Sequence, residues 1–421
     1  MGARIVGMVL AGGRVDELLV LTAKRPKSAV PIWGMYRFID FALSNMMHSG
    51  IDVVGLLSQY RPYSLNTHLA NGSPWDYVGR RRQLKVLSPY SGSADTDWYR
   101  GTADAIWQNL NFVDHFSPEL VLIASGDHVS SMDYRPLVRQ HPTTQADLTI
   151  VLKRVPLEQA AQYGTAVLDG DGRVLRYEEK APRPASDLAS LTVYLFAADV
   201  LARRLEENQR EGSAFQLYSE VLPRMVAEGD RVFGYVHEGY WQYARTLDGY
   251  YDASLDILRP QAPDLAGWQV RTNVAATASA DPPPALFGAD GLIVDSLVCA
   301  GCSIAGEVRS SVLSPWVTVE RGAVVRSSVL MDGCHVAAGA VVERAILDKQ
   351  VTVGRDARIG GGKAVANRSH PDVLASGAVV VGKATRIPAG CEVGSGAVLA
   401  PDISEARFAG GHVAAGATVE P

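Results

Sequence analysis

The sequence predicts an α/β protein in two parts, a mostly parallel sheet with helices followed by a left-handed parallel β-helix of hexapeptide repeats. Two observations support this prediction. Over residues 1–257, apolar runs typical of buried strands alternate with segments of helical periodicity. From about Ala285 onward, aliphatic residues recur at a fixed spacing among Gly, Ala, Ser and Asp.

The front part opens with an aliphatic run, Arg4–Leu10, that leads into the pair Gly12-Gly13. Such a run predicts a buried strand entering a glycine turn. Tyr36–His48 carries apolar residues at helical spacing and stops at Ser49-Gly50. Further strands are expected at Val53–Leu57, Leu120–Ala124, Leu148–Leu152, Val174–Tyr177 and Leu191–Phe196, and further helices at Ala103–Phe116, Val200–Leu205 and Leu217–Ala227. A parallel sheet binds ligands beyond the carboxyl ends of its strands, where the Gly12 turn and Asp127 lie.

The tail repeats first with a period of 17 residues and then with a period of six. At the period of 17, the aliphatic columns are Val308, Val325, Val342 and Ile359; Leu313, Leu330 and Leu347; and Val319, Val336 and Val353. Later the step is six, through Val381, Ile387, Val393 and Leu399, then Val413 and Val419. An aliphatic residue at every sixth position, with small residues between, predicts three strands per coil around a prism-shaped core.

These patterns predict a front domain over residues 1–257, a linker over residues 258–285 and a β-helix domain over residues 286–421. The linker contains Pro282-Pro283-Pro284, which predicts a stiff, extended connection over Pro260–Pro284.

Composition excludes several classes of protein. The 421 residues carry 40 Lys+Arg against 45 Asp+Glu, a net charge of −5, and the pI is near 6.0, which argues against a generally basic nucleic-acid binder. Four cysteines in a chain of this length do not form a disulfide scaffold. The N-terminal apolar run is too short to span a membrane. We therefore expect a soluble, cytoplasmic protein with no nucleic-acid or membrane partner.

Several motifs of the front part resemble those of sugar-phosphate nucleotidylyltransferases. The opening motif is Val9-Leu10-Ala11-Gly12-Gly13-Arg14, followed by Leu21-Thr22 and Lys24-Arg25-Pro26-Lys27-Ser28-Ala29-Val30-Pro31. Other motifs narrow the resemblance to the glucose-1-phosphate adenylyltransferase (ADP-glucose pyrophosphorylase) family: Tyr36-Arg37-Phe38-Ile39-Asp40-Phe41-Ala42-Leu43-Ser44-Asn45, Ser58-Gln59-Tyr60, Trp98-Tyr99-Arg100-Gly101-Thr102-Ala103-Asp104-Ala105, Ser125-Gly126-Asp127-His128, Met132-Asp133-Tyr134 and Glu179-Lys180. The β-helix tail fits the same family.

The resemblance implies a Rossmann-like nucleotidyltransferase domain that joins ATP and glucose 1-phosphate to give ADP-glucose and pyrophosphate, as in glycogen- or starch-type glucan biosynthesis. It also implies Mg²⁺, a homo- or heterotetramer and an anionic effector. Such a transfer depends on positioning and charge neutralisation, which backbone N–H groups, fixed cations and Mg²⁺ supply.

The resemblance also assigns roles to individual residues. Lys27 and Asp127 would be catalytic, with Asp127 a ligand of Mg²⁺. The nucleotide would contact Ala11, Gly12, Gly13, Gln59, Gly101 and Thr102. The sugar phosphate would contact Gly164, Glu179, Lys180 and Ser190.

The chain departs from the family pattern at three places. In the phosphate loop, Val15 replaces a glycine and Glu17 replaces an arginine that should face the phosphates. Tyr243 stands where the second metal-binding aspartate belongs, within Trp241-Gln242-Tyr243-Ala244-Arg245-Thr246. The family's His-Asp-Phe-Gly is replaced by Phe215-Gln216-Leu217-Tyr218. Arg14 and Arg245 are the residues that would supply the missing positive charge from new positions.

Other interpretations stay open on the sequence. The departures favour a catalytically impaired regulatory subunit of a hetero-oligomeric ADP-glucose pyrophosphorylase. Hexapeptide β-helices also occur in acyltransferases, where a coil histidine such as His335 or His412 would be a general base. Cys299 and Cys302 have the spacing of half a zinc site, although small buried thiols are a sufficient explanation. Arg61, Arg80, Arg81 and Arg82 are either an effector site or a solvated loop.

Overall fold

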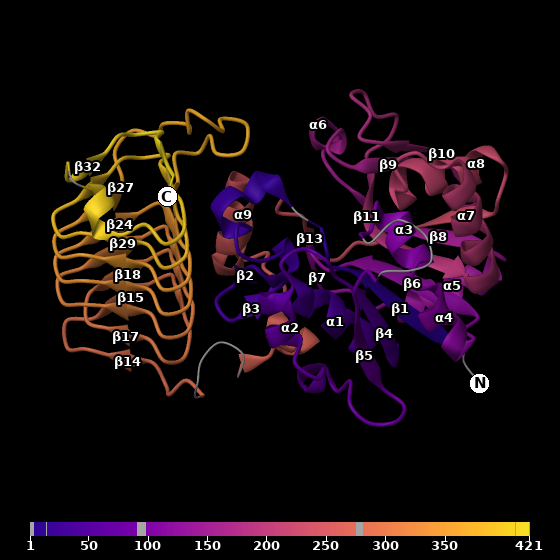
Figure 1. Cartoon of the computed structure of the whole chain (residues 1–421), viewed down its shortest axis with the longest axis horizontal. Coiled ribbons are helices and arrows are strands. Elements are labelled where there is room, and N and C mark those ends of the chain that lie inside the picture. The colour runs from indigo at the N-terminus through magenta and orange to yellow at the C-terminus, as the bar shows by residue number, and fades with distance from the viewer. Residues whose placement is uncertain (1–3, 14, 91–97, 275–280, 409, 421) are drawn as a thin grey trace.

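The computed structural model describes residues 4–420 except residues 14, 91–97, 275–280 and 409. Two domains lie side by side, with the N-terminal α/β domain on the right in Figure 1 and the C-terminal β-helix on the left. Helix α9 (Leu247–Leu255) lies between the sheet of the front domain and the β-helix.

In the described part of the front domain, a nine-stranded sheet forms the centre. Its strands are β1 (Ile5–Leu10), β4 (Val53–Leu57), β5 (Gln83–Leu87), β6 (Leu120–Ser125), β8 (Leu148–Arg154), β9 (Gly164–Leu168), β10 (Val174–Glu179), β11 (Leu188–Ala197) and β12 (Val232–Val236). The order along the main path is β10-β9-β11-β6-β1-β4-β5, and β8 joins β11 to β12. Strands β6, β1, β4 and β5 run parallel, so their carboxyl ends form one edge, and β11 runs antiparallel to β6. This parallel edge positions the candidate site.

Helices cover the two faces of this sheet. They are α1 (Phe38–His48), α2 (Tyr63–Leu69), α3 (Thr102–Trp107), α4 (Leu110–Phe116), α5 (Arg135–Thr143), α6 (Leu157–Ala160), α7 (Ala198–Glu211) and α8 (Leu222–Ala227). Two-residue strands form two small antiparallel pairs beside it: β2 (Pro31–Ile32) with β3 (Tyr36–Arg37), and β7 (Val129–Ser130) with β13 (Trp241–Gln242).

Two segments predicted as single helices are each divided. Helix α3 ends before α4 begins because the Asn109 side chain donates to the carbonyl oxygen of Ala105 at 2.8 Å and to the hydroxyl of Tyr99 at 2.9 Å. An asparagine that bonds the backbone in this way competes with the helix. In the other segment, a π-helical turn over Leu217–Val221 precedes α8, and Pro223 in the first turn of α8 has no N–H to continue the ladder.

The tail forms a parallel β-helix whose described strands make three sheets. One sheet is β14 (Leu286–Phe287), β17 (Ser303–Ile304), β20 (Thr318–Val319), β23 (His335–Val336), β26 (Thr352–Val353) and β29 (Arg386–Ile387). The second is β15 (Leu292–Val294), β18 (Glu307–Arg309), β21 (Val324–Arg326), β24 (Val341–Glu343), β27 (Arg358–Gly360), β30 (Glu392–Val393) and β32 (His412–Val413). The third is β16 (Leu297–Val298), β19 (Val312–Leu313), β22 (Val329–Leu330), β25 (Ala345–Leu347), β28 (Val379–Val381), β31 (Val398–Leu399) and β33 (Thr418–Val419).

The predicted columns are confirmed by the register of this β-helix. Val308, Val325, Val342 and Ile359 are direct cross-strand partners, and all are buried in one apolar core. Within the described residues, a long loop over residues 361–378 interrupts the repeat between β27 and β28. In that loop, Leu374 is fully buried. A short 3-10 turn over Glu405–Phe408 interrupts the repeat again between β31 and β32.

One apolar cluster joins the two domains. It contains Phe38, Trp33 and Tyr250 from the front domain with Met331 and Val398 from the β-helix. Within the linker, the structure contains helix α10 (Leu265–Trp268) where the sequence predicts an extended connection. Asp264 accepts from the N–H of Gly267 at 2.8 Å and starts this turn, and Trp268 donates to Asn45 of α1 at 2.8 Å. The linker therefore packs on the front domain, while the domain boundaries stay a prediction.

Candidate active site

A pocket of about 430 Å³ opens at the carboxyl ends of β1 and β6. It is lined by every residue that the sequence assigns to catalysis, nucleotide binding or sugar-phosphate binding: Ala11, Gly12, Gly13, Lys27, Gln59, Gly101, Thr102, Asp127, Gly164, Glu179, Lys180 and Ser190. These residues come from segments as far apart as 179 positions in the chain, and the sheet brings them together. Their individual roles stay a prediction.

The glycine turn after β1 contains two glycines with different surroundings. A Cβ on Gly12 would lie 2.8 Å from the backbone nitrogen of Gln59 and 2.9 Å from the Cα of Ser58. A Cβ on Gly13 would meet nothing within 4 Å, although Gly13 lines the pocket. Gly12 is therefore required for packing the turn against the end of β4, whereas Gly13 leaves room in the pocket itself.

This difference predicts opposite behaviour for two alanine variants. Gly12→Ala should lower the free energy of unfolding by about 1–3 kcal/mol, because backbone atoms must move to make room for the methyl group. Gly13→Ala should leave the stability unchanged and raise the KM for the nucleotide. Urea denaturation and steady-state kinetics measure the two effects. Equal stability of the two variants would contradict this account of the turn.

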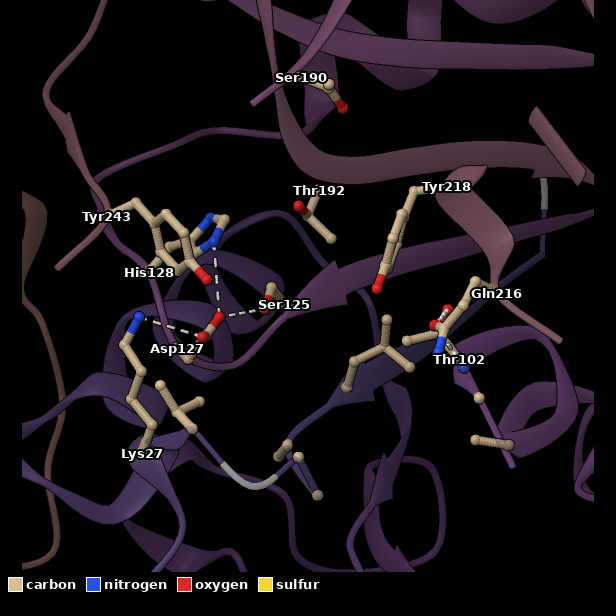
Figure 2. A pocket seen from close by; sticks show the side chains of 18 of the residues that line it. Lys27, Thr102, Ser125, Asp127, His128, Ser190, Thr192, Gln216, Tyr218 and Tyr243 are labelled. Carbon is tan, nitrogen blue, oxygen red and sulfur yellow. Dashed lines mark hydrogen bonds and ion pairs between the residues drawn. The ribbon is translucent and has the colours of Figure 1, made fainter. Parts of the chain in front are cut away.

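Lys27 and Asp127 form the charged centre of the pocket. The Nζ of Lys27 lies 3.1 Å from the Oδ2 of Asp127 and 3.8 Å from the centre of the Tyr243 ring. Figure 2 shows the three side chains converging, with His128 beside Tyr243 and Ser125 on the far side of the Asp127 carboxylate from Lys27. The Oγ of Ser125 donates to Oδ1 of Asp127, and the Nε2 of His128 lies 3.5 Å from it. The buried ammonium of Lys27 is thus held between a carboxylate and an aromatic face.

Burial and charge shift the pKa values of this group in opposite directions. Burial alone would raise the pKa of Asp127, but Lys27 and His128 outweigh it and lower that pKa to about 2. Burial lowers the pKa of His128 to about 4, against the opposing charge of Asp127. Burial likewise lowers the pKa of Lys27, while Asp127 raises it. At neutral pH, Asp127 is therefore ionised and His128 is neutral.

The ligand set for a metal ion is smaller than the family pattern implies. Burial raises the pKa of Tyr243, so its phenol is neutral and is a poor ligand for a hard cation. Among the described residues, no cluster of three or more His, Cys, Asp or Glu side chains has the geometry to hold a metal. Asp127 alone fits a Mg²⁺ ion that takes its remaining ligands from water and substrate phosphates, which is a common arrangement for this ion.

At the other end of the pocket, Gln59 and Gln216 fix the segment around Gly101. The side-chain oxygen of Gln59 accepts from the N–H of Tyr99 at 2.9 Å. The side-chain oxygen of Gln216 accepts from the N–H of Thr102 at 3.2 Å and from its hydroxyl at 3.0 Å. A Cβ on Gly101 would lie 2.2 Å from the carbonyl oxygen of Phe215. The segment that departs from the family pattern therefore supports the predicted nucleotide-binding residues.

The predicted sugar-phosphate residues lie around a second group of side chains. The Nζ of Lys180 is 3.6 Å from Glu179, and it is 5.9 Å from the ring centre of Tyr218. Burial raises the pKa of Glu179, although Lys180 opposes this shift. The hydroxyls of Ser190 and Tyr194 are 3.3 Å apart. In Figure 2, Tyr218 faces the Lys27 and Asp127 group across the pocket, so the departure at this position places an aromatic ring in the site.

Thr192 is a pocket residue that the sequence did not identify. It lies in β11 at φ +53°, within a register shift between Ser190 and Tyr194. A β-branched residue in the left-handed region is strained, and such strain concentrates at functional sites. Figure 2 shows its side chain at the pocket, between the Asp127 group and Tyr218. No pattern in the sequence marks a bulge inside an apolar strand.

We expect Thr192→Gly to raise the free energy of unfolding by about 1 kcal/mol, since glycine adopts this backbone conformation without strain. The same change should weaken sugar-phosphate binding about fivefold, because the pocket loses a hydroxyl. Gln145, at φ +49° in an exposed turn, gives the control variant Gln145→Gly, which should stabilise without affecting binding. A fall in stability for Thr192→Gly would contradict the strain argument.

Glu17, which stands where the family has an arginine, is paired with Arg245 and is not an isolated negative charge. Its Oε1 accepts from Nε of Arg245 at 3.1 Å and from Nη2 at 3.0 Å. Hydrogen bonds and the charge of Arg245 lower the pKa of Glu17 against the effect of burial. Two of the departures from the family pattern are thus in contact with each other. Arg14, the other proposed source of positive charge, lies outside the described residues.

Comparison with known proteins agrees with this geometry. A family described as nucleotidyl transferase matches residues 6–259, and one described as GlmU-like C-terminal hexapeptide matches residues 283–381. The glucose-1-phosphate adenylyltransferase of Thermomicrobium roseum is 39% identical over 98% of this chain and 97% of its own length. The protein of that name from Acetivibrio thermocellus is 36% identical over 96% of this chain and 95% of its own length. That from Thermotoga maritima is 39% identical over 94% of this chain and 93% of its own length.

The chain belongs to the glucose-1-phosphate adenylyltransferase family. The resemblance seen in the motifs is confirmed, as is the left-handed β-helix of hexapeptide repeats. Full-length similarity to adenylyltransferases does not favour the regulatory-subunit alternative. Members of the nucleotidyltransferase family generally use a divalent metal. Within the described residues, no helix is both long and apolar enough to cross a membrane.

This adenylyltransferase-family chain has a second cavity, of about 830 Å³, between the two domains. Its cationic lining residues are Lys24, Arg25, Arg37, Arg61, Lys349 and Lys383. Arg37 is buried and its Nε has no hydrogen-bond partner in the described structure. Burial lowers the pKa of Lys349 to about 8, although Asp332 lies 2.8 Å away. Of the four arginines that the sequence singled out, Arg61 lines this cavity, whereas Arg82 pairs with Asp52 and Arg80 and Arg81 are exposed.

The histidines and cysteines that the sequence raised as a general base or half a zinc site lie on the surface or in the core of the β-helix. His335 lies on the coil surface 2.9 Å from Glu320, and His412 is exposed. Cys299 and Cys302 carry free thiols in the described structure, and burial raises the pKa of both. Cys302 belongs to the core of the β-helix, which agrees with the interpretation as a small buried residue.

Proposed function

We propose that this protein transfers the adenylyl group of ATP to glucose 1-phosphate, giving ADP-glucose and pyrophosphate for glucan synthesis in the cytoplasm. The observation that supports this most directly is the convergence of all predicted nucleotide, sugar-phosphate and catalytic residues on one pocket. The reaction that the relatives' name describes needs such a pocket, with phosphates from two substrates at its centre.

In the proposed reaction, an oxygen of the sugar phosphate attacks the α-phosphorus of ATP. A new P–O bond forms, the bond from the α-phosphorus to the bridging oxygen breaks, and pyrophosphate leaves with the electron pair. Lys27 would stabilise the charge that develops on the transferring phosphate, since its buried ammonium is fixed by Asp127 and Tyr243. Lys180 would hold the sugar phosphate. Mg²⁺, held by Asp127 and the substrate phosphates, would neutralise the leaving pyrophosphate.

Pyrophosphate release by the isolated chain tests this proposal. With millimolar ATP, Mg²⁺ and glucose 1-phosphate, we expect turnover that requires both substrates and falls when GTP or UTP replaces ATP. Absence of turnover under these conditions would reject catalysis by this chain alone and revive the regulatory-subunit interpretation. In that case, turnover in the variant Glu17→Arg/Tyr243→Asp would attribute the loss to these two positions.

We also propose that an anionic effector binds in the cavity between the domains. Six cationic side chains line it, and the unpaired Nε of Arg37 offers a buried donor. Inorganic phosphate is the probe: we expect it to shift the half-saturating ATP concentration, and the variant Arg61→Gln to weaken that shift. No response to phosphate or to phosphorylated sugars would reject the effector site. A homo- or heterotetramer, as the resemblance implies, is testable by light scattering on the same preparation.

A further inference from the structure

Glu17 and Arg245 are in contact close to the active-site pocket, although 228 positions separate them in the chain. Neither lines the pocket, but Val15 and Tyr243, each two residues away from one of them, do. Glu17 lies in the short helical segment after the glycine turn, and Arg245 lies two residues beyond Tyr243. Their side chains are 35% and 36% exposed, so a ligand and solvent both have access to the pair. Figure 2 shows Tyr243 beside Lys27, and the Nζ of Lys27 lies 3.8 Å from the centre of its ring, so the segment that carries Arg245 begins next to the charged centre of the pocket.

The electrostatic surroundings place this pair among the charged groups of the site. The charge of Arg245 lowers the pKa of Lys27, in the charged centre of the pocket, and opposes the raised pKa of Glu179, among the predicted sugar-phosphate residues. It also acts on the phenols of Tyr163, Tyr218 and Tyr243. Glu17 in turn is influenced by Lys180. Arg245 is therefore a further cation close to the pocket, and Glu17 offsets its charge.

The bond between the two side chains is not the strongest that they can make. Both hydrogen bonds of Arg245 go to the same oxygen of Glu17, whereas the strong arrangement uses two oxygens in parallel. A partly exposed pair of this kind contributes little to stability. A phosphate group carries more charge than a carboxylate and offers several oxygens, so it competes well for the guanidinium.

We propose that Arg245 is a phosphate-binding cation of this site that Glu17 holds until the polyphosphate of the nucleotide, or pyrophosphate, displaces it. The inference deepens the proposed function and rests on it. Glu17 acts as a positioning residue, and Arg245 takes over the neutralising role of the loop arginine that the chain lacks at position 17.

Pyrophosphate binding, measured by titration calorimetry at fixed Mg²⁺, tests the proposal without turnover. Glu17→Gln frees Arg245 and removes a repelling charge, so we expect it to tighten binding about fivefold. Arg245→Gln should weaken binding about tenfold or more, which corresponds to about 1.4 kcal/mol. Loss of affinity in both single variants would indicate a merely structural pair and overturn the proposal.

The double variant Glu17→Gln/Arg245→Gln gives the sharpest comparison. If Arg245 serves only to neutralise Glu17, its removal has no effect once Glu17 is already neutral. If Arg245 binds phosphate, the double variant binds pyrophosphate about tenfold more weakly than Glu17→Gln. Equal affinity of these two variants would overturn the proposal. Adenosine, which has no phosphate, should bind all variants equally well.

Failure of this inference is distinguishable from failure of the proposed function. If the substitutions change pyrophosphate affinity as expected but the chain shows no turnover with ATP and glucose 1-phosphate, the proposed reaction is rejected. The role of Arg245 in binding phosphate is then retained. If the chain turns over its substrates but the Arg245 substitution leaves pyrophosphate affinity unchanged, this inference alone is rejected.

Discussion

Lys27→Met should lower kcat by about a thousandfold, because the site loses the fixed cation at the transferring phosphate. Removal of one preorganised donor to a developing oxyanion costs about 100–1,000-fold, and a full buried charge lies at the upper end of that range. Methionine has nearly the same length and suits the apolar surroundings of Lys27, which include the rings of Phe38 and Tyr243. The measurement is steady-state pyrophosphate release as a function of both substrate concentrations.

The variant leaves Asp127 without its lysine partner, and this determines the controls. Asp127 keeps the hydroxyl of Ser125 and partial solvent exposure, so we expect a folded protein with an unchanged circular dichroism spectrum. Lys85→Met, at an exposed site on β5, removes a lysine elsewhere and should leave kcat unchanged. A Lys27→Met protein that turns over within threefold of the parent would show that Lys27 does not act on the reacting phosphate.

The β-helix was the part of the fold most fully predicted from the sequence, for a physical reason. Each coil places an aliphatic residue at the same position of the prism, so that Val308, Val325 and Val342 stack as direct neighbours. A local spacing thus encodes a long-range contact, and the columns can be read without knowledge of the packing. The excursion over residues 361–378 breaks the spacing, and only the structure shows that it packs beside the front domain through hydrogen bonds to Asp248.

The front domain was predicted less completely, because its missed strands have weak local signals. Strand β5 is at the sheet edge and is half polar, with Lys85 exposed. Strand β12 contains Gly234, which is closely packed, since a Cβ there would lie 2.8 Å from a terminal methyl group of Leu168. Glycine inside a strand lowers the apparent strand propensity even where tertiary packing demands it. The boundaries of these elements are therefore decided by neighbours distant in the sequence.

In the candidate site, too, the features encoded by local motifs were predicted and those that depend on distant residues were not. Motifs were sufficient to select the lining residues, since Lys27, Asp127 and Lys180 belong to contiguous patterns. Pairings between departures were not predictable, because nothing local connects Glu17 with Arg245 or Gln216 with Thr102. In these pairs, the two residues that form the hydrogen bond are 228 and 114 positions apart in the chain. The departures therefore form a consistent set of contacts, which the sequence alone presented as separate losses.

Asp348→Asn should destabilise the junction of the two domains by about 3 kcal/mol, the second large effect that we expect. Asp348, at the end of β25, forms a 2.5 Å ion pair with Arg25 of the front domain, and both side chains are almost fully buried. The substitution leaves the Arg25 guanidinium buried without a counter-charge, and removal of one partner of such a pair is costly. Because one apolar cluster spans both domains, we expect the parent to unfold in a single calorimetric transition and the variant in two.

The neighbouring ion pair supplies a matched control. Lys24 and Asp402 also join the two domains, but their side chains are 43% and 55% exposed. Asp402→Asn should therefore change the free energy of unfolding by less than about 1 kcal/mol. The double variant Arg25→Met/Asp348→Leu replaces the buried pair by apolar side chains and should recover most of the loss, because the desolvation cost disappears with the charges. If Asp348→Asn were no more destabilising than Asp402→Asn, water in the adjacent cavity would be solvating Arg25, and the apolar cluster alone would hold the domains together.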